Sequence, residues 1–207
     1  RNVTGVQTCA LPIYDPVANT FTLELEQFCP PTPGQSFKLP MHIPVAVGLL
    51  DAQGRDIPLQ LEGPHGGGEA EVHAVPTTLV LELTAAKQRF TFTGITAPPV
   101  PSLLRNFSAP VILDYDYSDD ELAFLLAHDT DPFNRWDAGQ RLATRRLLQL
   151  ADTGVAADFS YLPNRQDELL AGALHKLLND TSLDAAFRDL VLTLPSETML
   201  AEMVEII

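Results

Sequence analysis

Polar and apolar residues alternate along the first half of the chain, which predicts β-strands. In Thr20–Phe28, the side chains of Phe21, Leu23 and Leu25 would point to one side and the threonines and glutamates to the other. Glycines and prolines separate this segment from further short apolar runs. Strands are also predicted at residues 43–50, 57–61, 78–84, 88–93, 102–107 and 111–117. So many short strands in roughly 100 residues favour a two-sheet β-sandwich of immunoglobulin-like type.

A tight turn is predicted within this half at Asp51–Gly54. Because it joins residues 43–50 to residues 57–61, the pattern indicates a β-hairpin. Pro44 and Pro58 lack an amide proton, so those positions should face away from a central ladder of hydrogen bonds.

The period of the pattern becomes helical from Ser118. Ser118 and Glu121 form a capping box, and Leu122, Leu125 and Leu126 follow on one helical face. Further helices are predicted near residues 132–151, 165–179, 182–192 and 196–207. Short helices in series are typical of an α-helical array of solenoid type. The last predicted helix lacks a stop signal, which indicates truncation.

This pattern divides the chain into a β-sandwich at residues 14–117 and the start of a C-terminal helical domain at residues 118–207. Residues 1–13 show neither alternation nor a helical period, and they lack the apolar core of a secretory signal. We therefore expect no strand in this leader, and the first ordered strand near Thr20.

Composition narrows the possible partners. The 207 residues include 27 acidic and 13 basic ones, for a net charge of −14, which argues against binding to nucleic acid or an anionic membrane. No apolar stretch approaches the ~18 residues of a spanning helix, so the sequence predicts a soluble protein. Cys9 and Cys29 could pair in an oxidising compartment, but Cys9 lies in the leader, so the sequence does not support a disulfide framework.

The histidines are not spaced as metal ligands. None of the five belongs to an H-E-x-x-H helix, which leaves no visible zinc site. His128 lies beside Asp129 and Asp131, and a hydrogen-bonded helix end is favoured there over a metal cluster. The histidines are His42, His65, His73, His128 and His175.

The sequence gives equally weak support for other kinds of site. Gly63–Gly68 could cradle an anion, but no Lys-Ser/Thr pair follows and Glu69 and Glu71 would repel phosphate. Calcium binding by the acidic pairs remains a minor alternative, because they fit no calcium-loop pattern. We predict no catalytic, cofactor-binding or metal-binding residue in the chain. The serines without a nucleophile motif are Ser102, Ser108 and Ser160, and the acidic pairs are Asp114/Asp116 and Asp119/Asp120.

Four ordered stretches carry a family resemblance. They are CPPTPGQ at 29–35, MHIPVAVGL at 41–49, PVPSLLR at 99–105 followed by FSAPV at 107–111, and DPFNRWDA at 131–138. The chain from Tyr14 onward resembles the bacterial aminopeptidase N family, the zinc-dependent alanyl aminopeptidases of the gluzincin group. The resemblance implies a catalytic domain before the sandwich, and a long helical domain that covers the active-site cavity.

The resemblance also implies what this chain lacks. The family holds zinc with H-E-x-x-H and a later glutamate and binds the substrate amine with G-A-M-E-N, and none of these motifs is present. The implied function is that of a non-catalytic fragment, whose cytoplasmic parent removes N-terminal residues from peptides. The fragment would bind no zinc, nucleic acid or membrane, and its partners would be the catalytic and distal helical domains. The alternative is a free-standing peptide- or protein-binding module without enzymatic activity.

The leader has a resemblance of its own. Val3–Ile13 is similar to the translation of a widely used sequencing adapter, which implies a non-native leader at residues 1–13. Cys9 would then be spurious, and Cys29 alone suits a reducing cytoplasm. We expect deletion of Arg1–Ile13 to change the free energy of unfolding by less than about 0.5 kcal/mol.

Overall fold

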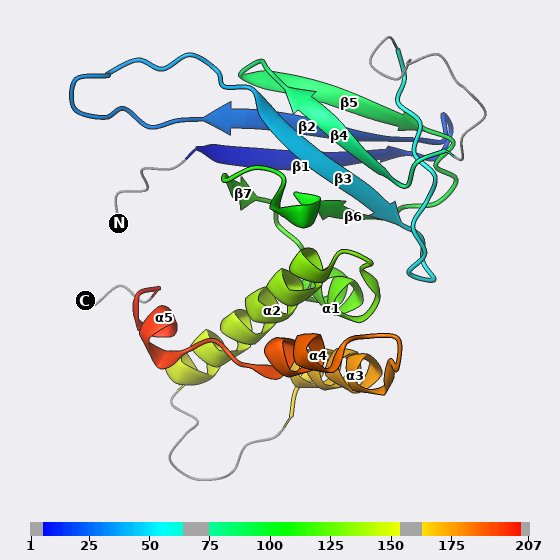
Figure 1. Cartoon of the computed structure of the whole chain (residues 1–207), viewed down its shortest axis with the longest axis vertical. Coiled ribbons are helices and arrows are strands. Elements are labelled where there is room, and N and C mark those ends of the chain that lie inside the picture. The colour runs from blue at the N-terminus through cyan, green and yellow to red at the C-terminus, as the bar shows by residue number, and fades with distance from the viewer. Residues whose placement is uncertain (1–5, 64–74, 154–162, 204–207) are drawn as a thin grey trace. The chain divides into compact units, whose positions relative to one another are not determined.

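The computed structural model describes residues 6–63, 75–153 and 163–203 (Figure 1). The chain divides into two compact units, Arg1–Asp116 and Tyr117–Ile207, and each is described by itself.

The first unit contains two β-sheets. One has the strand order β5-β2-β1-β7 and the other the order β4-β3-β6. Neighbouring strands are antiparallel except β1 and β7, which are parallel. The strands are β1 (Gln7–Asp15), β2 (Thr20–Phe28), β3 (Ile43–Leu50), β4 (Thr78–Leu83), β5 (Lys87–Thr93), β6 (Val100–Leu103) and β7 (Ile112–Asp114).

The apolar core follows the predicted alternation in β2. Phe21, Leu23 and Leu25 are buried, and Phe21 contacts Phe92 of β5 with ring centroids 6.5 Å apart. Strand β3 differs, because Val45–Leu50 is buried without alternation. Residues Arg105–Phe107, which follow β6, also contact β3, so this strand is covered on both faces.

The predicted hairpin forms its turn but not its second strand. The amide of Gly54 donates to the carbonyl of Asp51 over 2.9 Å, and the φ of +79° at Gly54 suits glycine. Residues 57–61 form no strand, although the amide of Ile57 donates to the carbonyl of Leu49 over 2.8 Å. At the far end of this segment, Leu61 forms an isolated bridge with Phe92 of β5. These residues cross from one sheet to the other, and Pro58 cannot donate to a ladder. The predicted strand is therefore wrong.

Two other predicted strands are shorter than expected. Residues 102–107 are not one strand, because β6 ends at Leu103 and Leu104 adopts a φ of 58°. A 3-10 helix, η2, follows at Arg105–Phe107. Strand β7 is confined to Ile112–Asp114.

The expectation of no strand in residues 1–13 is wrong for residues 7–13. Strand β1 pairs along its full length with β2, and Gln7–Cys9 also pair with β7. The pattern failed because the buried positions hold Thr8 and Ala10, whereas the larger Leu11 and Ile13 are exposed. Deleting the leader would remove part of a strand with two neighbours, so the expected change below about 0.5 kcal/mol no longer holds.

Thr8 offers a test of how well β1 fits its sheet. Its side chain is fully buried, and within the described residues its hydroxyl has no hydrogen-bond partner. Replacing Thr8 with valine should raise the free energy of unfolding by about 1–2 kcal/mol, because an unsatisfied hydroxyl is removed at nearly constant shape. Thr22→Val is the control in urea denaturation, since the Thr22 hydroxyl lies 3.0 Å from that of Thr91. Destabilisation by Thr8→Val would show that the hydroxyl is satisfied.

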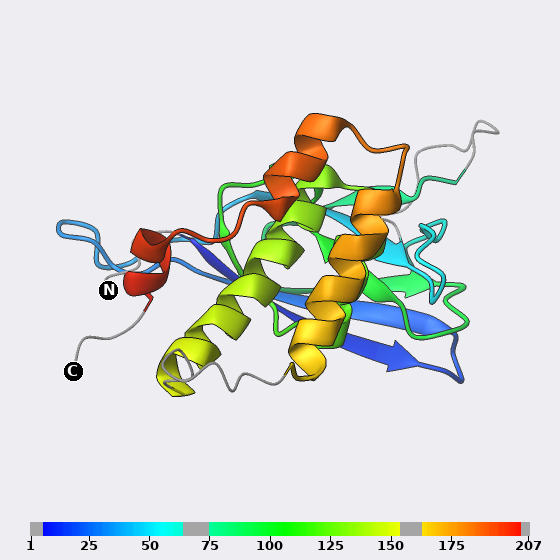
Figure 2. The ribbon, with the colours of Figure 1, turned by 90° about the horizontal axis from the view of Figure 1, so that it is seen from below.

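The second unit is helical. Its helices are α1 (Asp119–His128), α2 (Pro132–Thr153), α3 (Arg165–Asn179), α4 (Ala185–Leu192) and α5 (Glu197–Ala201). Helix α1 packs against α2 and α3, and Figure 2 shows α2 and α3 side by side. None of the described helices is both long and apolar enough to span a membrane.

Capping explains where these helices begin. The predicted capping box is confirmed in α1, where the Glu121 amide donates to the Ser118 hydroxyl over 3.2 Å. Helix α4 begins later than the predicted residue 182, because the Asp184 carboxylate accepts hydrogen bonds from the amides of Ala186 and Phe187. The described part of α5 ends at Ala201.

Candidate functional site

A buried polar cluster in the described part of the first unit surrounds Arg105. Its side chain is only 3% exposed, yet its guanidinium is well bonded. Nε donates to the Ser102 hydroxyl over 2.9 Å and Nη1 to the Thr78 hydroxyl over 2.8 Å. Nη2 lies 2.6 Å from a carboxylate oxygen of Asp56. The cluster therefore ties β4, β6 and the loop after β3 together, as a buried charge requires.

Backbone strain and a glycine place this arginine. Leu104, Asn106 and Phe107 have φ angles of 58°, 54° and 51°, which cost on the order of 1–3 kcal/mol each for such residues. The side chain then lies over Gly48 of β3, where an added Cβ would be 2.0 Å from the Arg105 Cζ. Gly48 thus leaves the space that the guanidinium fills.

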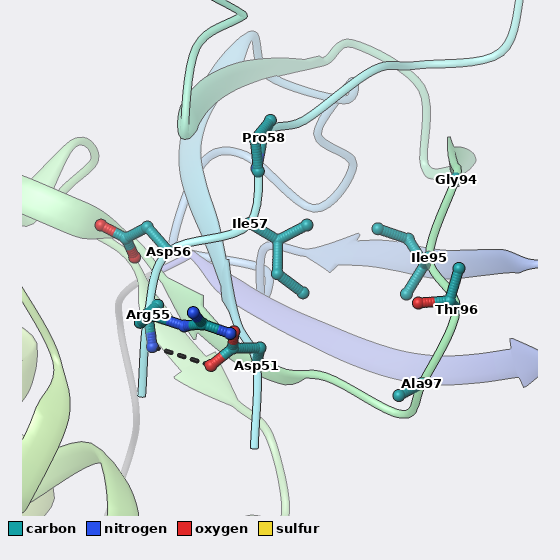
Figure 3. A pocket seen from close by; sticks show the side chains of 9 residues that line it. All are labelled: Asp51, Arg55, Asp56, Ile57, Pro58, Gly94, Ile95, Thr96 and Ala97. Atoms are coloured by element: carbon teal, nitrogen blue, oxygen red, sulfur yellow. Dashed lines mark hydrogen bonds and ion pairs between the residues drawn. The ribbon is translucent and has the colours of Figure 1, made fainter. Parts of the chain in front are cut away.

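A hollow of about 410 Å³ lies beside this cluster (Figure 3). Its two carboxylates are already engaged, Asp51 with Arg55 at 2.8 Å and Asp56 with Arg105. The described lining residues include no histidine, cysteine or serine. It is lined by Asp51, Arg55, Asp56, Ile57, Pro58, Gly94, Ile95, Thr96 and Ala97.

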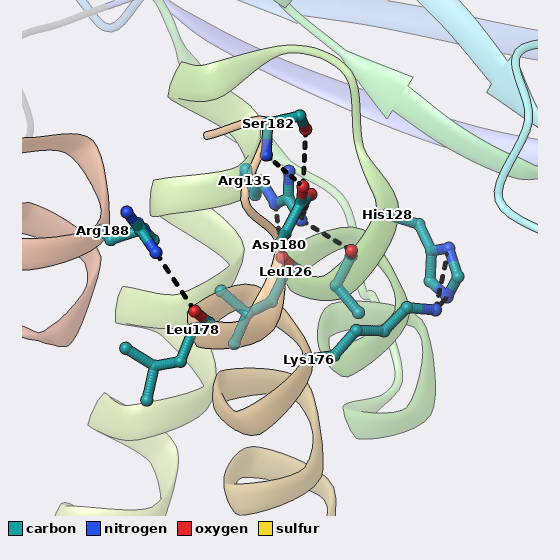
Figure 4. A network of polar contacts seen from close by, with 9 residues as sticks. Leu126, His128, Arg135, Lys176, Leu178, Asp180, Ser182 and Arg188 are labelled. Carbon is teal, nitrogen blue, oxygen red and sulfur yellow. Dashed lines mark hydrogen bonds and ion pairs between the residues drawn. The ribbon is translucent and has the colours of Figure 1, made fainter. Parts of the chain in front are cut away.

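A second polar cluster joins the helices of the second unit (Figure 4). The buried Arg135 donates from Nε to the carbonyl of Leu126 over 2.8 Å and from Nη2 to that of Ala127 over 2.7 Å. These carbonyls belong to the last turn of α1 and have no acceptor role inside the helix. Nη2 also lies 3.7 Å from the Asp180 carboxylate. Burial lowers the pKa of Arg135 below its ordinary value.

Asp180 is held by its own chain as well. Its carboxylate accepts hydrogen bonds from the Ser182 hydroxyl and amide, which lower its pKa. A smaller hollow of about 210 Å³ lies beside Arg135 and Ser182, between the α1–α2 and α3–α4 connections. Two of its lining residues bond to helix ends, Arg135 to the last turn of α1 and Asp184 to the first turn of α4.

The histidines that the structure describes have local partners. His42 contacts the Glu82 carboxylate. His128 Nε2 lies 2.6 Å from Lys176 Nζ (Figure 4), and the His128 ring stacks on Phe124. His175 contacts the side chain of Asn179. His65 and His73 lie outside the described residues.

The favoured helix-end interpretation agrees with the contacts of Asp129 and Asp131. Asp129 accepts from the amide of Asp131 over 2.9 Å, and Asp131 accepts from the amide of Asn134 over 2.9 Å, at the start of α2. Across the described ranges, no three His, Cys, Asp or Glu side chains are grouped to hold a metal ion.

Four further candidates, Asp119, Asp120, Ser102 and Ser108, also have structural contacts. Asp119 binds Arg145 at 3.0 Å, and Asp120 binds the exposed Arg165 at 2.7 Å. Burial alone would raise the pKa of Asp119, but hydrogen bonds from Gln166 and Arg145 outweigh it and lower that pKa. Ser102 accepts from Arg105, and the Ser108 hydroxyl accepts from the Ala46 amide. Ser160 and residues 64–68 lie outside the described part of the chain.

Two family models match the chain. One, described as a domain of unknown function (DUF3458) with an Ig-like fold, matches residues 8–116. The other, DUF3458_C, described as ARM repeats, matches residues 119–207. The chain belongs to the DUF3458 family, an Ig-like domain followed by ARM repeats, which confirms the predicted sandwich and helical array.

The relatives are aminopeptidases. The chain is 39% identical to aminopeptidase N of Escherichia coli (strain K12) over 194 residues, which are 94% of this chain and 21% of that protein. It is 38% identical to aminopeptidase N of Haemophilus influenzae over 192 residues, 91% of this chain and 20% of that protein. These matches confirm the resemblance to the aminopeptidase N family.

A solved structure of an aminopeptidase is also similar to this chain. The crystal structure of Legionella pneumophila aminopeptidase A in complex with aspartic acid is similar with a TM-score of 0.69 and 26% identity, over 96% of this chain and 19% of that one. The chain thus spans about a fifth of the length of its relatives and corresponds to a non-catalytic part of aminopeptidase N homologues.

Proposed function

We propose that this chain is a non-catalytic part of a cytoplasmic zinc aminopeptidase that removes N-terminal residues from peptides. The β-sandwich would act as a spacer, and the helices would form part of the cover of the active-site cavity. The observation that carries the proposal is the 39% identity to E. coli aminopeptidase N along 94% of this chain but only 21% of that protein.

The polar clusters support a scaffolding role. Arg105 and Arg135 are buried and bonded to groups of their own unit, which leaves their donors engaged in holding the fold. Zinc, in this proposal, is held by residues of the parent beyond this chain, because the described His, Cys, Asp and Glu residues form no group that fits it. The partners of this chain would be the catalytic and distal helical domains of the parent, and the substrate of the parent would be a peptide. The free thiol of Cys29 is compatible with a reducing cytoplasm.

A chimera tests this function. Replacing the matching segment of E. coli aminopeptidase N with this chain should leave hydrolysis of an alanyl chromogenic amide within about tenfold of the parent, a change of about 1.4 kcal/mol in the barrier. The same enzyme without the segment should lose its activity. A folded chimera as inactive as the deletion would contradict the proposal, and an active deletion enzyme would favour a free-standing binding module.

A further inference from the structure

The connection between β2 and β3 exposes a cluster of large apolar side chains. Phe37 is 76% exposed, Leu39 is 73% exposed and Met41 is 43% exposed. They occupy alternate positions in a segment without helix or strand, and together they are called the loop patch here. Single exposed apolar residues are ordinary on a soluble protein, but three within five residues make this segment a candidate interaction surface.

The loop patch is anchored at one end, at Met41. The Gln27 side chain accepts from the Met41 amide and donates to the Met41 carbonyl, each over 2.8 Å. It also donates to the carbonyl of Ala85 over 3.1 Å. Figure 1 shows the connection reaching well beyond the ends of β2 and β3. Because the Met41 backbone is already held by β2, less of the patch has to be ordered on docking.

The segment that carries the loop patch has no acidic residue of its own, which is unusual in this chain. The protein carries 27 acidic residues, yet none lies between Glu26 and Asp51. Lys38 stands between Phe37 and Leu39. The segment therefore fits an apolar groove whose rim carries carboxylates, one of which could pair with Lys38.

We propose that the loop patch docks into such a groove on another domain of the aminopeptidase parent. This inference rests on the proposed function. We assign the groove to the parent because of the length of the relatives. This chain covers only 21% of E. coli aminopeptidase N and 20% of the Haemophilus protein. Most of such a chain lies outside the sandwich and helices described here, and it can supply the groove.

Thiol labelling tests the docking. Leu39→Cys is placed in the isolated chain and in the chimera with E. coli aminopeptidase N, and peptide mapping separates it from Cys9 and Cys29. Position 39 should react at least about tenfold more slowly in the chimera, because burial restricts a thiol. Val17→Cys is the control, since Val17 is 91% exposed in the β1–β2 turn. Equal slowing at positions 17 and 39, or none at 39, would overturn the proposal.

A triple variant gives a second readout. Phe37→Ser, Leu39→Ser and Met41→Ser together should leave the thermal midpoint of the isolated chain unchanged and lower that of the chimera. No change in the chimera would overturn the docking, and an isolated dimer that the triple variant dissociates would assign the loop patch to a second copy instead. The outcomes separate the two proposals: an active chimera with fast labelling at position 39 supports the proposed function and overturns only the docking.

Discussion

Replacing Gly48 with alanine is expected to destabilise the first unit by about 3 kcal/mol, a cost typical of overpacking combined with a broken buried charge cluster. A Cβ at this position would lie 2.0 Å from the Arg105 Cζ and 2.3 Å from its Nε. The guanidinium would have to leave the Ser102 and Asp56 oxygens to make room. Urea denaturation followed by far-ultraviolet circular dichroism measures the change.

Gly172→Ala is the matched control for this substitution. Gly172 lies inside α3, and an added Cβ there meets nothing within 4 Å. Because alanine favours a helix over glycine, the control should be neutral or stabilising by up to about 1 kcal/mol. If Gly48→Ala behaves like Gly172→Ala, then Arg105 does not occupy the space over β3.

Replacing Arg135 with methionine is expected to destabilise the second unit by about 2–4 kcal/mol. The change would leave the Leu126 and Ala127 carbonyls without their guanidinium donor, and each unsatisfied buried group costs about 1–3 kcal/mol. It would also remove the 3.7 Å pair with Asp180. Trp136 is the single tryptophan of the chain and lies in α2, so its fluorescence reports unfolding of this unit.

Arg165→Met is the control, because it removes the same charge from the surface. Arg165 pairs with Asp120 at 2.7 Å, but its side chain is 76% exposed. Exposed pairs contribute about 0–1 kcal/mol, so the midpoint of the fluorescence transition should move little. Equal losses in the two variants would mean that Arg135 contributes only charge and not the capping of α1.

Local pattern was sufficient where an element depends on its own residues. Thr20–Phe28 was predicted residue for residue from alternation, and Arg165–Asn179 from its helical period. The start of α1 followed from Ser118 and Glu121, because a capping box needs only four consecutive residues. Sequence pattern therefore predicted the fold class and most of the elements.

Elements that depend on distant neighbours were not predictable in this way. Strand β1 pairs with β2 and β7 through its backbone, although Thr8 and Ala10 are polar or small at its buried positions. Residues 57–61 carry a strand-like pattern, but they cross between sheets that the pattern could not order.

The polar clusters were missed for the same reason. Arg105 gathers groups from Asp56, Thr78 and Ser102, which lie up to 49 positions away in sequence. One signal was present, namely an arginine at the end of the apolar stretch PSLL and a glycine inside the apolar stretch of β3. Only the fold places these two residues together.

The central claim, that this chain is a non-catalytic part of an aminopeptidase, is tested most directly by a turnover assay. The purified 207-residue chain is incubated with zinc and an alanyl chromogenic amide, beside E. coli aminopeptidase N under the same conditions. The account predicts rapid release of the chromophore by the E. coli enzyme and no release above buffer by this chain. Release that rises in proportion to the concentration of this chain, and that a zinc chelator abolishes, would contradict it.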